Sequence, residues 1–181
     1  MAEPLVVVAY QTNWPELFAS LGFRLRDALG PVATRIDHIG STAVRGLDAK
    51  PVIDVQVSVV ALDPHAVFST PLQAVGFVFR PDNPERTKRY FREPPGQPRT
   101  HIHVRRAGSF SEQFALLFRD YLRHHVERAD AYAMLKWELA AQFRNDRQGY
   151  VDAKEPFIWD SIRLADAWAQ AIGWEPGPSD A

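Results

Sequence analysis

Apolar side chains recur at helical spacing in several segments of this chain. The first segment begins with Trp14-Pro15, ends with Gly30-Pro31 and carries a leucine at every fourth position, namely Leu17, Leu21, Leu25 and Leu29. Proline is favoured in the first turn of a helix and glycine after the last, so this segment is predicted to be an amphipathic helix. Asp63-Pro64 and Gly76 delimit a second predicted helix over 64–76. Apolar stripes predict further helices after 109, over 132–143 and over 157–172.

Other segments alternate between apolar and polar positions, as strands do. Between 52 and 60 one face carries Ile53, Val55, Val57 and Val59, and the other carries Asp54, Gln56 and Ser58. Shorter strands are predicted over 34–39, 77–80, 89–92 and 100–106, with 89–92 at a sheet edge. This alternation indicates an α/β (α+β) fold in one domain over residues 1–174. Residues 175–181, with two prolines and a glycine, are expected to form a flexible tail.

Composition narrows the classes of function. The net charge of −1 over 181 residues does not favour nucleic acid or an anionic membrane as partner, so a phosphorylated ligand needs local cations. The chain has no cysteine, which excludes disulfides, thiolate metal sites and a cysteine nucleophile. No stretch approaches the roughly 18 apolar residues of a membrane span, and the N-terminus lacks a targeting pattern. We therefore expect a cytoplasmic protein.

The strongest local signal is Gly40-Ser41-Thr42 at the end of a predicted strand, with Asp54 on the next one. Glycine lets backbone N–H groups approach a phosphate, and hydroxyl side chains add donors. A carboxylate such as Asp54 can hold a divalent ion beside them. The alternative is an ordinary turn capped by Ser41 or Thr42, with Asp54 hydrogen-bonded to the backbone.

A second signal lies in the strand predicted over 100–106. Its alternation puts His101 and His103 on one face, where two neutral imidazoles are good ligands for a transition metal. The alternative is that both histidines hydrogen-bond to carboxylates or backbone. Between 80 and 106 the chain also holds eight basic and three acidic residues, Arg89 among the basic ones. This excess could bind a polyphosphate or remain a solvated arm.

The run from Arg35 to Asp54, RIDHIGSTAVRGLDAKPVID, resembles the signature of GrpB-like proteins, a branch of the nucleotidyltransferase superfamily. Shorter matches at Tyr10, 101–104, 118–122 and around Lys154 extend the resemblance over roughly residues 10–168. It implies a nucleotidyltransferase-like mixed sheet flanked by helices. A related domain occurs fused to dephospho-CoA kinase in some proteins.

The resemblance also implies roles for particular residues. In active members of the superfamily, glycine and serine contact nucleotide phosphates, and two acidic residues two positions apart hold a divalent metal, normally Mg²⁺. Gly40, Ser41 and Asp54 match this pattern. The resemblance therefore predicts a metal-dependent nucleotide-binding protein, and a nucleotidyltransferase acting on an unknown acceptor. The predicted catalytic residues are Asp54 and Lys50, and the predicted phosphate contacts are Gly40, Ser41, Thr42 and Arg89.

One position departs from the pattern, because neutral Gln56 stands where the second acidic residue is expected. A two-metal mechanism needs close, negatively charged ligands, so Gln56 keeps two alternatives open. The first is an inactive module that binds a nucleotide or a CoA precursor. The second is a transition-metal enzyme that uses Asp54, His101 and His103.

Overall fold

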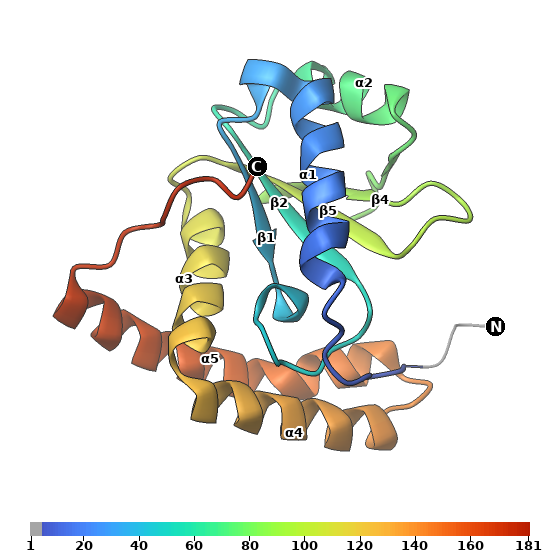
Figure 1. Cartoon of the computed structure of the whole chain (residues 1–181). Coiled ribbons are helices and arrows are strands. Elements are labelled where there is room, and N and C mark those ends of the chain that lie inside the picture. Colours follow the sequence, from blue (N-terminus) through green and yellow to red (C-terminus); the bar gives the residue numbers. More distant parts are fainter. Residues whose placement is uncertain (1–4) are drawn as a thin grey trace.

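Five strands form one mixed sheet in the computed structural model, which describes residues 5–181 (Figure 1). The strands lie in the order β1 (Arg35–Ile39), β2 (Ile53–Val59), β5 (Thr100–Arg106), β4 (Lys88–Arg92) and β3 (Val78–Phe79). The central pair, β2 and β5, is parallel, and the other three pairs are antiparallel. Parallel neighbours need a crossover, which α2 (Ala66–Ala74) and the β3–β4 hairpin provide.

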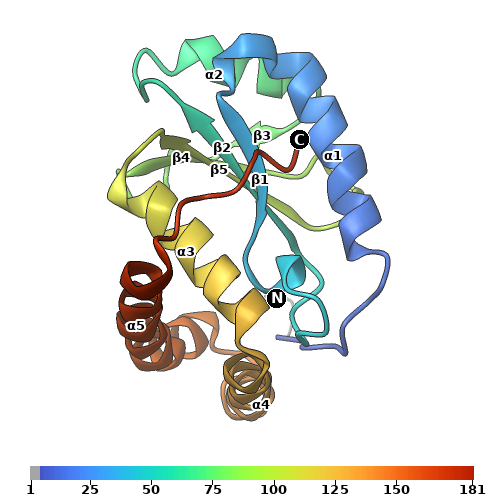
Figure 2. The same cartoon turned by 60° about the vertical axis from the view of Figure 1, so that its left-hand side comes forward.

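Helices cover both faces of this sheet (Figure 2). Helix α1 (Trp14–Leu29) packs with α2 on the face that carries the apolar residues of β2. Helix α3 (Phe110–His124) lies on the opposite face, and α4 (Val126–Gln142) and α5 (Arg147–Ile172) pack against it and each other. This arrangement confirms the predicted mixed sheet flanked by helices. No helix of the described residues is long and apolar enough to span a membrane.

The polar face of β2 is buried because α3 covers it. Gln56 and Ser58 are both fully buried, and the Ser58 hydroxyl donates to the Glu112 carboxylate of α3. Ser109 caps α3, since its hydroxyl accepts from the Glu112 N–H. The Glu112 side chain accepts from the Gly108 N–H and so does not complete a capping box with the Ser109 N–H.

Two structural predictions need correction. The segment 89–92 does form a strand, but β4 is not an edge strand because the short β3 pairs with its outer side. In α1 the buried stripe includes Trp14 and Phe18, whereas Leu17 is exposed. A strict four-residue repeat drifts around a helix of 3.6 residues per turn, so it does not stay on one face.

The C-terminal residues, which composition predicts to be flexible, lie along the free edge of β1 (Figure 1). The Asp180 carboxylate accepts from the His38 N–H at 2.9 Å and pairs with Arg119 at 2.9 Å. Ser179 and Ala181 bond to the backbone of Ile36. These contacts satisfy polar groups that an open sheet edge would leave unpaired.

Phe91 provides a test of the packing between β4 and α2. Its fully buried ring contacts the rings of Phe68 and Phe79. Phe91→Ala is expected to lower the free energy of unfolding by about 3–5 kcal/mol, because it leaves a cavity in the core. Phe110→Ala, at an exposed position, should change it by less than about 0.5 kcal/mol. Denaturant unfolding of both variants checks this, and equal effects would contradict the packing.

Candidate functional site

Asp54, His101 and His103 meet on the face of the sheet that α3 also covers. The parallel register pairs Asp54 with His101 and Gln56 with His103, so these side chains project to the same side. Asp54 Oδ1 lies 3.0 Å from His101 Nδ1 and 3.2 Å from His103 Nε2. One ligand atom from each residue falls within 4.8 Å of the others. The structure therefore brings together the three residues predicted as metal ligands.

The protonation of these groups suits a metal ion. Burial lowers the pKa of His103 to about 4, so its imidazole is neutral at neutral pH. Burial alone would raise the pKa of Asp54, but hydrogen bonds from both histidines outweigh it and hold that pKa well below its usual range. Two imidazoles and one carboxylate on one side form a donor set for a divalent transition metal.

The outer nitrogens of the two imidazoles also affect whether His101 and His103 can bind a metal ion. His101 Nε2 and His103 Nδ1 are buried and have no hydrogen-bond partner among residues 5–181. A partner at the outer nitrogen normally fixes the tautomer of a metal-binding histidine. Here the inner nitrogens can carry a proton towards Asp54 or present a lone pair to an ion. The residues present therefore fit a metal ion.

Gly40 lies directly against Asp54. Its backbone has a φ of 72°, and a Cβ atom there would stand 2.8 Å from Asp54 Oδ2. Glycine is thus required twice, for the left-handed conformation and for the close approach. The following turn, Ser41–Ala43, begins with a bond from the Ala43 N–H to the Gly40 carbonyl. The N–H groups of Ser41 and Thr42 consequently have no partner within the turn.

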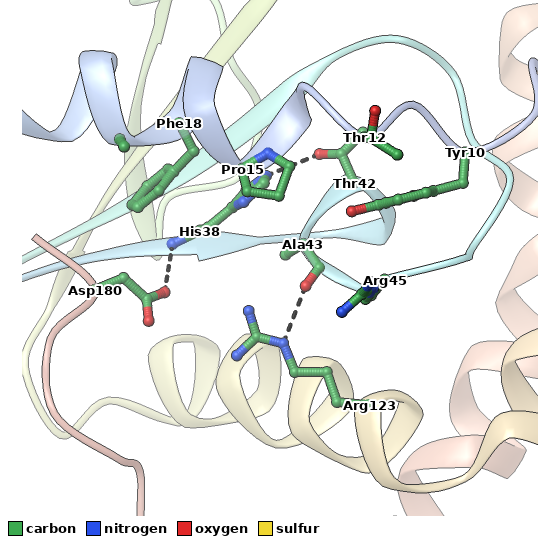
Figure 3. Close-up of a pocket in the computed structure, with 11 residues that line it drawn as sticks. Tyr10, Thr12, Pro15, Phe18, His38, Thr42, Ala43, Arg45, Arg123 and Asp180 are labelled. Atoms are coloured by element: carbon green, nitrogen blue, oxygen red, sulfur yellow. Dashed lines mark hydrogen bonds between the residues drawn. The ribbon is translucent and has the colours of Figure 1, made fainter.

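The hydroxyl groups of Ser41 and Thr42 in this turn differ in whether they are free to contact a ligand. Thr42 is buried, and its hydroxyl donates to the Val52 carbonyl at 3.0 Å. Because that donation uses its only proton, Thr42 accepts from His38 Nε2, 3.0 Å away (Figure 3). The Ser41 side chain is only partly buried and is a hydrogen-bond partner of the Tyr132 hydroxyl. The Thr42 hydroxyl is therefore committed internally, and only its N–H remains for a phosphate.

Lys50 and Lys154 lie near Asp54, and Lys136 lies near both of these lysines, although the sequence pattern indicated only Lys50. Burial lowers the pKa of Lys50 to about 8 and that of Lys136 to about 7, and it also lowers the pKa of Lys154. Each ammonium is further affected by the charge of at least one of its basic neighbours. None of the three forms an ion pair with a carboxylate in the described part of the chain. The positive charge of these three lysines is thus not compensated by carboxylate ion pairs among the described residues.

Aromatic rings hold these lysines in place. The Lys50 and Lys154 ammonium groups lie 4.7 and 4.5 Å from the centre of the Tyr150 ring. Lys136 lies 4.6 Å from that of Tyr132 and donates to the Asp48 carbonyl. One feature of the sequence could have indicated this lysine cluster. Lys136 interrupts an otherwise apolar helical stripe formed by Tyr132, Leu135 and Leu139.

A pocket of about 690 Å³ opens beside Lys50. Its polar lining is mostly cationic and comprises Lys50, Arg92, Arg99, Arg144, Arg147, Asn145 and Glu93. The charges of Arg147 and Asp54 both act on Lys50 and Lys154, which connects this pocket electrostatically with the Asp54 cluster. The pocket is accordingly suited to an anionic ligand.

Two residues considered from sequence lie outside this arrangement. Arg89 points to the opposite face of the sheet and forms an ion pair with Asp63 at 2.8 Å. Strand alternation instead puts Tyr90 beside the rings of His101 and His103. Gln56 is buried, where its side-chain oxygen accepts from Arg105 at 2.6 Å and its amide reaches the Glu112 carbonyl at 3.4 Å. Gln56 is therefore engaged in packing α3 onto the sheet.

The sequence matches the family model described as GrpB protein over residues 4–163. It is 33% identical over 162 residues to the UPF0157 protein YqkA of Bacillus subtilis, covering 90% of this chain and 47% of YqkA. It is also 33% identical over 199 residues to a dephospho-CoA kinase of Mycobacterium tuberculosis, covering 96% of this chain and 49% of the kinase. The chain thus spans about half the length of these two relatives.

Solved structures give the same picture of the fold. The crystal structure of the conserved protein GrpB from Enterococcus faecalis superposes with a TM-score of 0.81 at 29% identity, covering 90% of this chain and 99% of that one. The Cid1 poly(U) polymerase bound to MgGTP superposes with a TM-score of 0.51 at 15% identity, covering 75% and 44%. The second likeness establishes a nucleotidyltransferase-like fold and nothing about activity.

His38, behind the glycine turn, predicts a pH dependence of stability. Burial lowers its pKa from 6.5 to about 4, so between these values the unfolded chain binds a proton that the folded chain excludes. Its contribution to the free energy of unfolding should fall as the pH drops from 6.5 to 4, by up to about 1.4 kcal/mol per pH unit. His38→Gln retains a donor for Thr42 but cannot be protonated. Urea unfolding across this range should give a shallower slope for the variant, and identical slopes would contradict the assignment.

Proposed function

This chain belongs to the GrpB family, and from that premise we propose that it binds a nucleotide together with a divalent metal ion. The proposal rests on two sets of side chains that lie around the Gly40 turn. Carboxylate and imidazole ligands from Asp54, His101 and His103 lie on one side of it, and cations without carboxylate partners lie near the same carboxylate. A metal–polyphosphate complex supplies both the positive ion and the negative groups that these two sets lack.

In this proposal each group has a distinct task. Asp54, His101 and His103 hold the ion, and the N–H groups of Ser41 and Thr42 with the Ser41 hydroxyl contact phosphate oxygens. Lys50, Lys136 and Lys154 neutralise the remaining phosphate charge, which raises their pKa values towards the ordinary range for lysine. When held by these three residues, a divalent ion would supply Lewis-acid stabilisation of a phosphoryl oxygen. Two nitrogen ligands favour Mn²⁺ or Zn²⁺ over Mg²⁺, whose preferred ligands are oxygen atoms.

Nucleotidyl transfer is the reaction we propose for this site, and the acceptor is unassigned. The likeness to the Cid1 poly(U) polymerase supports the fold that such a reaction uses. The name dephospho-CoA kinase on relatives twice as long supports a phosphorylated small molecule as ligand. Gln56, engaged with Arg105, favours the second candidate, a module that binds nucleotide without turnover. Product formation in the presence of metal and nucleotide separates the two.

The decisive experiment is calorimetric titration of nucleotides and CoA precursors, with and without Mg²⁺, Mn²⁺ or Zn²⁺. The wild-type chain should bind one of these ligands more tightly with metal. Asp54→Asn keeps the size of the side chain but removes its charge, and should weaken metal-dependent binding by roughly tenfold or more. Equal affinity of a folded Asp54→Asn protein would reject the metal role of Asp54.

The phosphate contacts have their own test, with Arg89 as the matched control. Ser41→Ala should weaken nucleotide binding by about two- to tenfold, the usual range for one neutral hydrogen bond. Lys154→Gln should weaken it by about tenfold or more, because a charged partner is lost. Arg89→Gln, on the other face of the sheet, should leave the affinity unchanged. If Arg89→Gln has the largest effect, the ligand binds elsewhere.

A further inference from the structure

A separate pocket of about 480 Å³ lies behind the Gly40 turn (Figure 3). It is lined by the N-terminal loop, the start of α1, the end of β1, α3 and the C-terminal segment. Thr42 and Ala43 form part of its wall, whereas Asp54 and the three lysines do not line it. The pocket is thus distinct from the proposed nucleotide site, although both adjoin the same turn.

The charge of this pocket is positive. Arg45 is exposed and forms no hydrogen bond or ion pair with any residue of the described chain. The Arg123 Nε donates to the Ala43 carbonyl at 3.0 Å, and its Nη1 is 3.6 Å from Asp120. The single carboxylate in the lining, Asp180, is already paired with Arg119 at 2.9 Å. Arg45 therefore has no carboxylate partner among the described residues, and Arg123 shares the Asp120 carboxylate with Arg119.

The remaining lining adds polar and apolar contacts. The Tyr10 hydroxyl points into the pocket, and Thr12 lies beside it (Figure 3). Tyr10 itself is held by the edge of the Trp14 ring, at 5.2 Å between centroids, and by its N–H bond to Asp48. Pro15, Phe18 and Ala19 form an apolar wall on the α1 side. A ligand for this lining carries a negative group and a small apolar body.

We propose that this pocket binds a small organic anion, either a phosphate monoester or a carboxylate of similar size. Its charged group lies between Arg45 and Arg123. Arginine pairs with either oxyanion through two parallel N–H donors. The Tyr10 hydroxyl donates a further hydrogen bond, and the apolar body rests against Pro15 and Phe18. This site does not depend on nucleotide binding at Asp54.

Phenyl phosphate, benzoate and the neutral p-cresol serve as probes in titrations followed by amide NMR of the full chain. At least one anion should shift the amides of Thr12, Ala43 and Arg45, and p-cresol should bind more weakly. Tighter binding of phenyl phosphate assigns a phosphate ligand, and tighter binding of benzoate a carboxylate.

Arg45→Gln, an exposed change that should not affect folding, is expected to weaken binding about tenfold or more. Tyr10→Phe should weaken it about two- to tenfold.

Ser41→Ala provides the control, because Ser41 belongs to the proposed nucleotide site and does not line this pocket. It should leave the anion affinity unchanged while it weakens nucleotide binding. The proposal is overturned if neither anion shifts these amides, if p-cresol binds as tightly as the anions, or if Arg45→Gln binds the anions like the wild type. Failure of nucleotide binding alone would leave these results unaffected.

Discussion

The parallel pairing of β2 with β5 is the constraint on which the rest of the site depends. Its register sets Asp54 opposite His101 and Gln56 opposite His103, so one carboxylate oxygen lies within hydrogen-bonding distance of two imidazoles. A shift of one residue would turn both histidines to the apolar face. Gly40 then lies against the same carboxylate, because β1 pairs Ile39 with Asp54. The proposed metal ligands and the proposed phosphate-binding turn are thus positioned by one ladder of strands.

The second determinant of the proposed site is the burial of cations without carboxylate partners. Removing an ammonium group from water is costly unless an anion compensates it, and the lowered pKa of Lys136 expresses that cost. Packing on the rings of Tyr132 and Tyr150 offsets part of it. The remaining deficit is what a polyphosphate would relieve.

Much of this arrangement follows from local sequence patterns. Alternation alone predicted the strand 100–106 with its histidines on one face, and the structure has β5 over Thr100–Arg106. Alternation could not predict that β5 lies beside β2, because strand order depends on long-range pairing. It also could not place Arg89, since its face depends on strand register. Lys136 and Lys154 were missed as site residues because Lys154 comes near Asp54, and Lys136 comes near Lys50 and Lys154, only when α4 and α5 pack.

We propose that Asp54, His101 and His103 hold an ion beside phosphates bound at the Gly40 turn. A crystal structure grown with Mn²⁺ or Zn²⁺ and a non-hydrolysable nucleotide tests it most directly, through the anomalous signal of the metal. We expect a metal peak about 2 Å from ligand atoms of all three residues, with phosphate oxygens at Ser41 and the lysines. A nucleotide bound away from this turn, or a metal peak that lacks Asp54 as ligand, would contradict it.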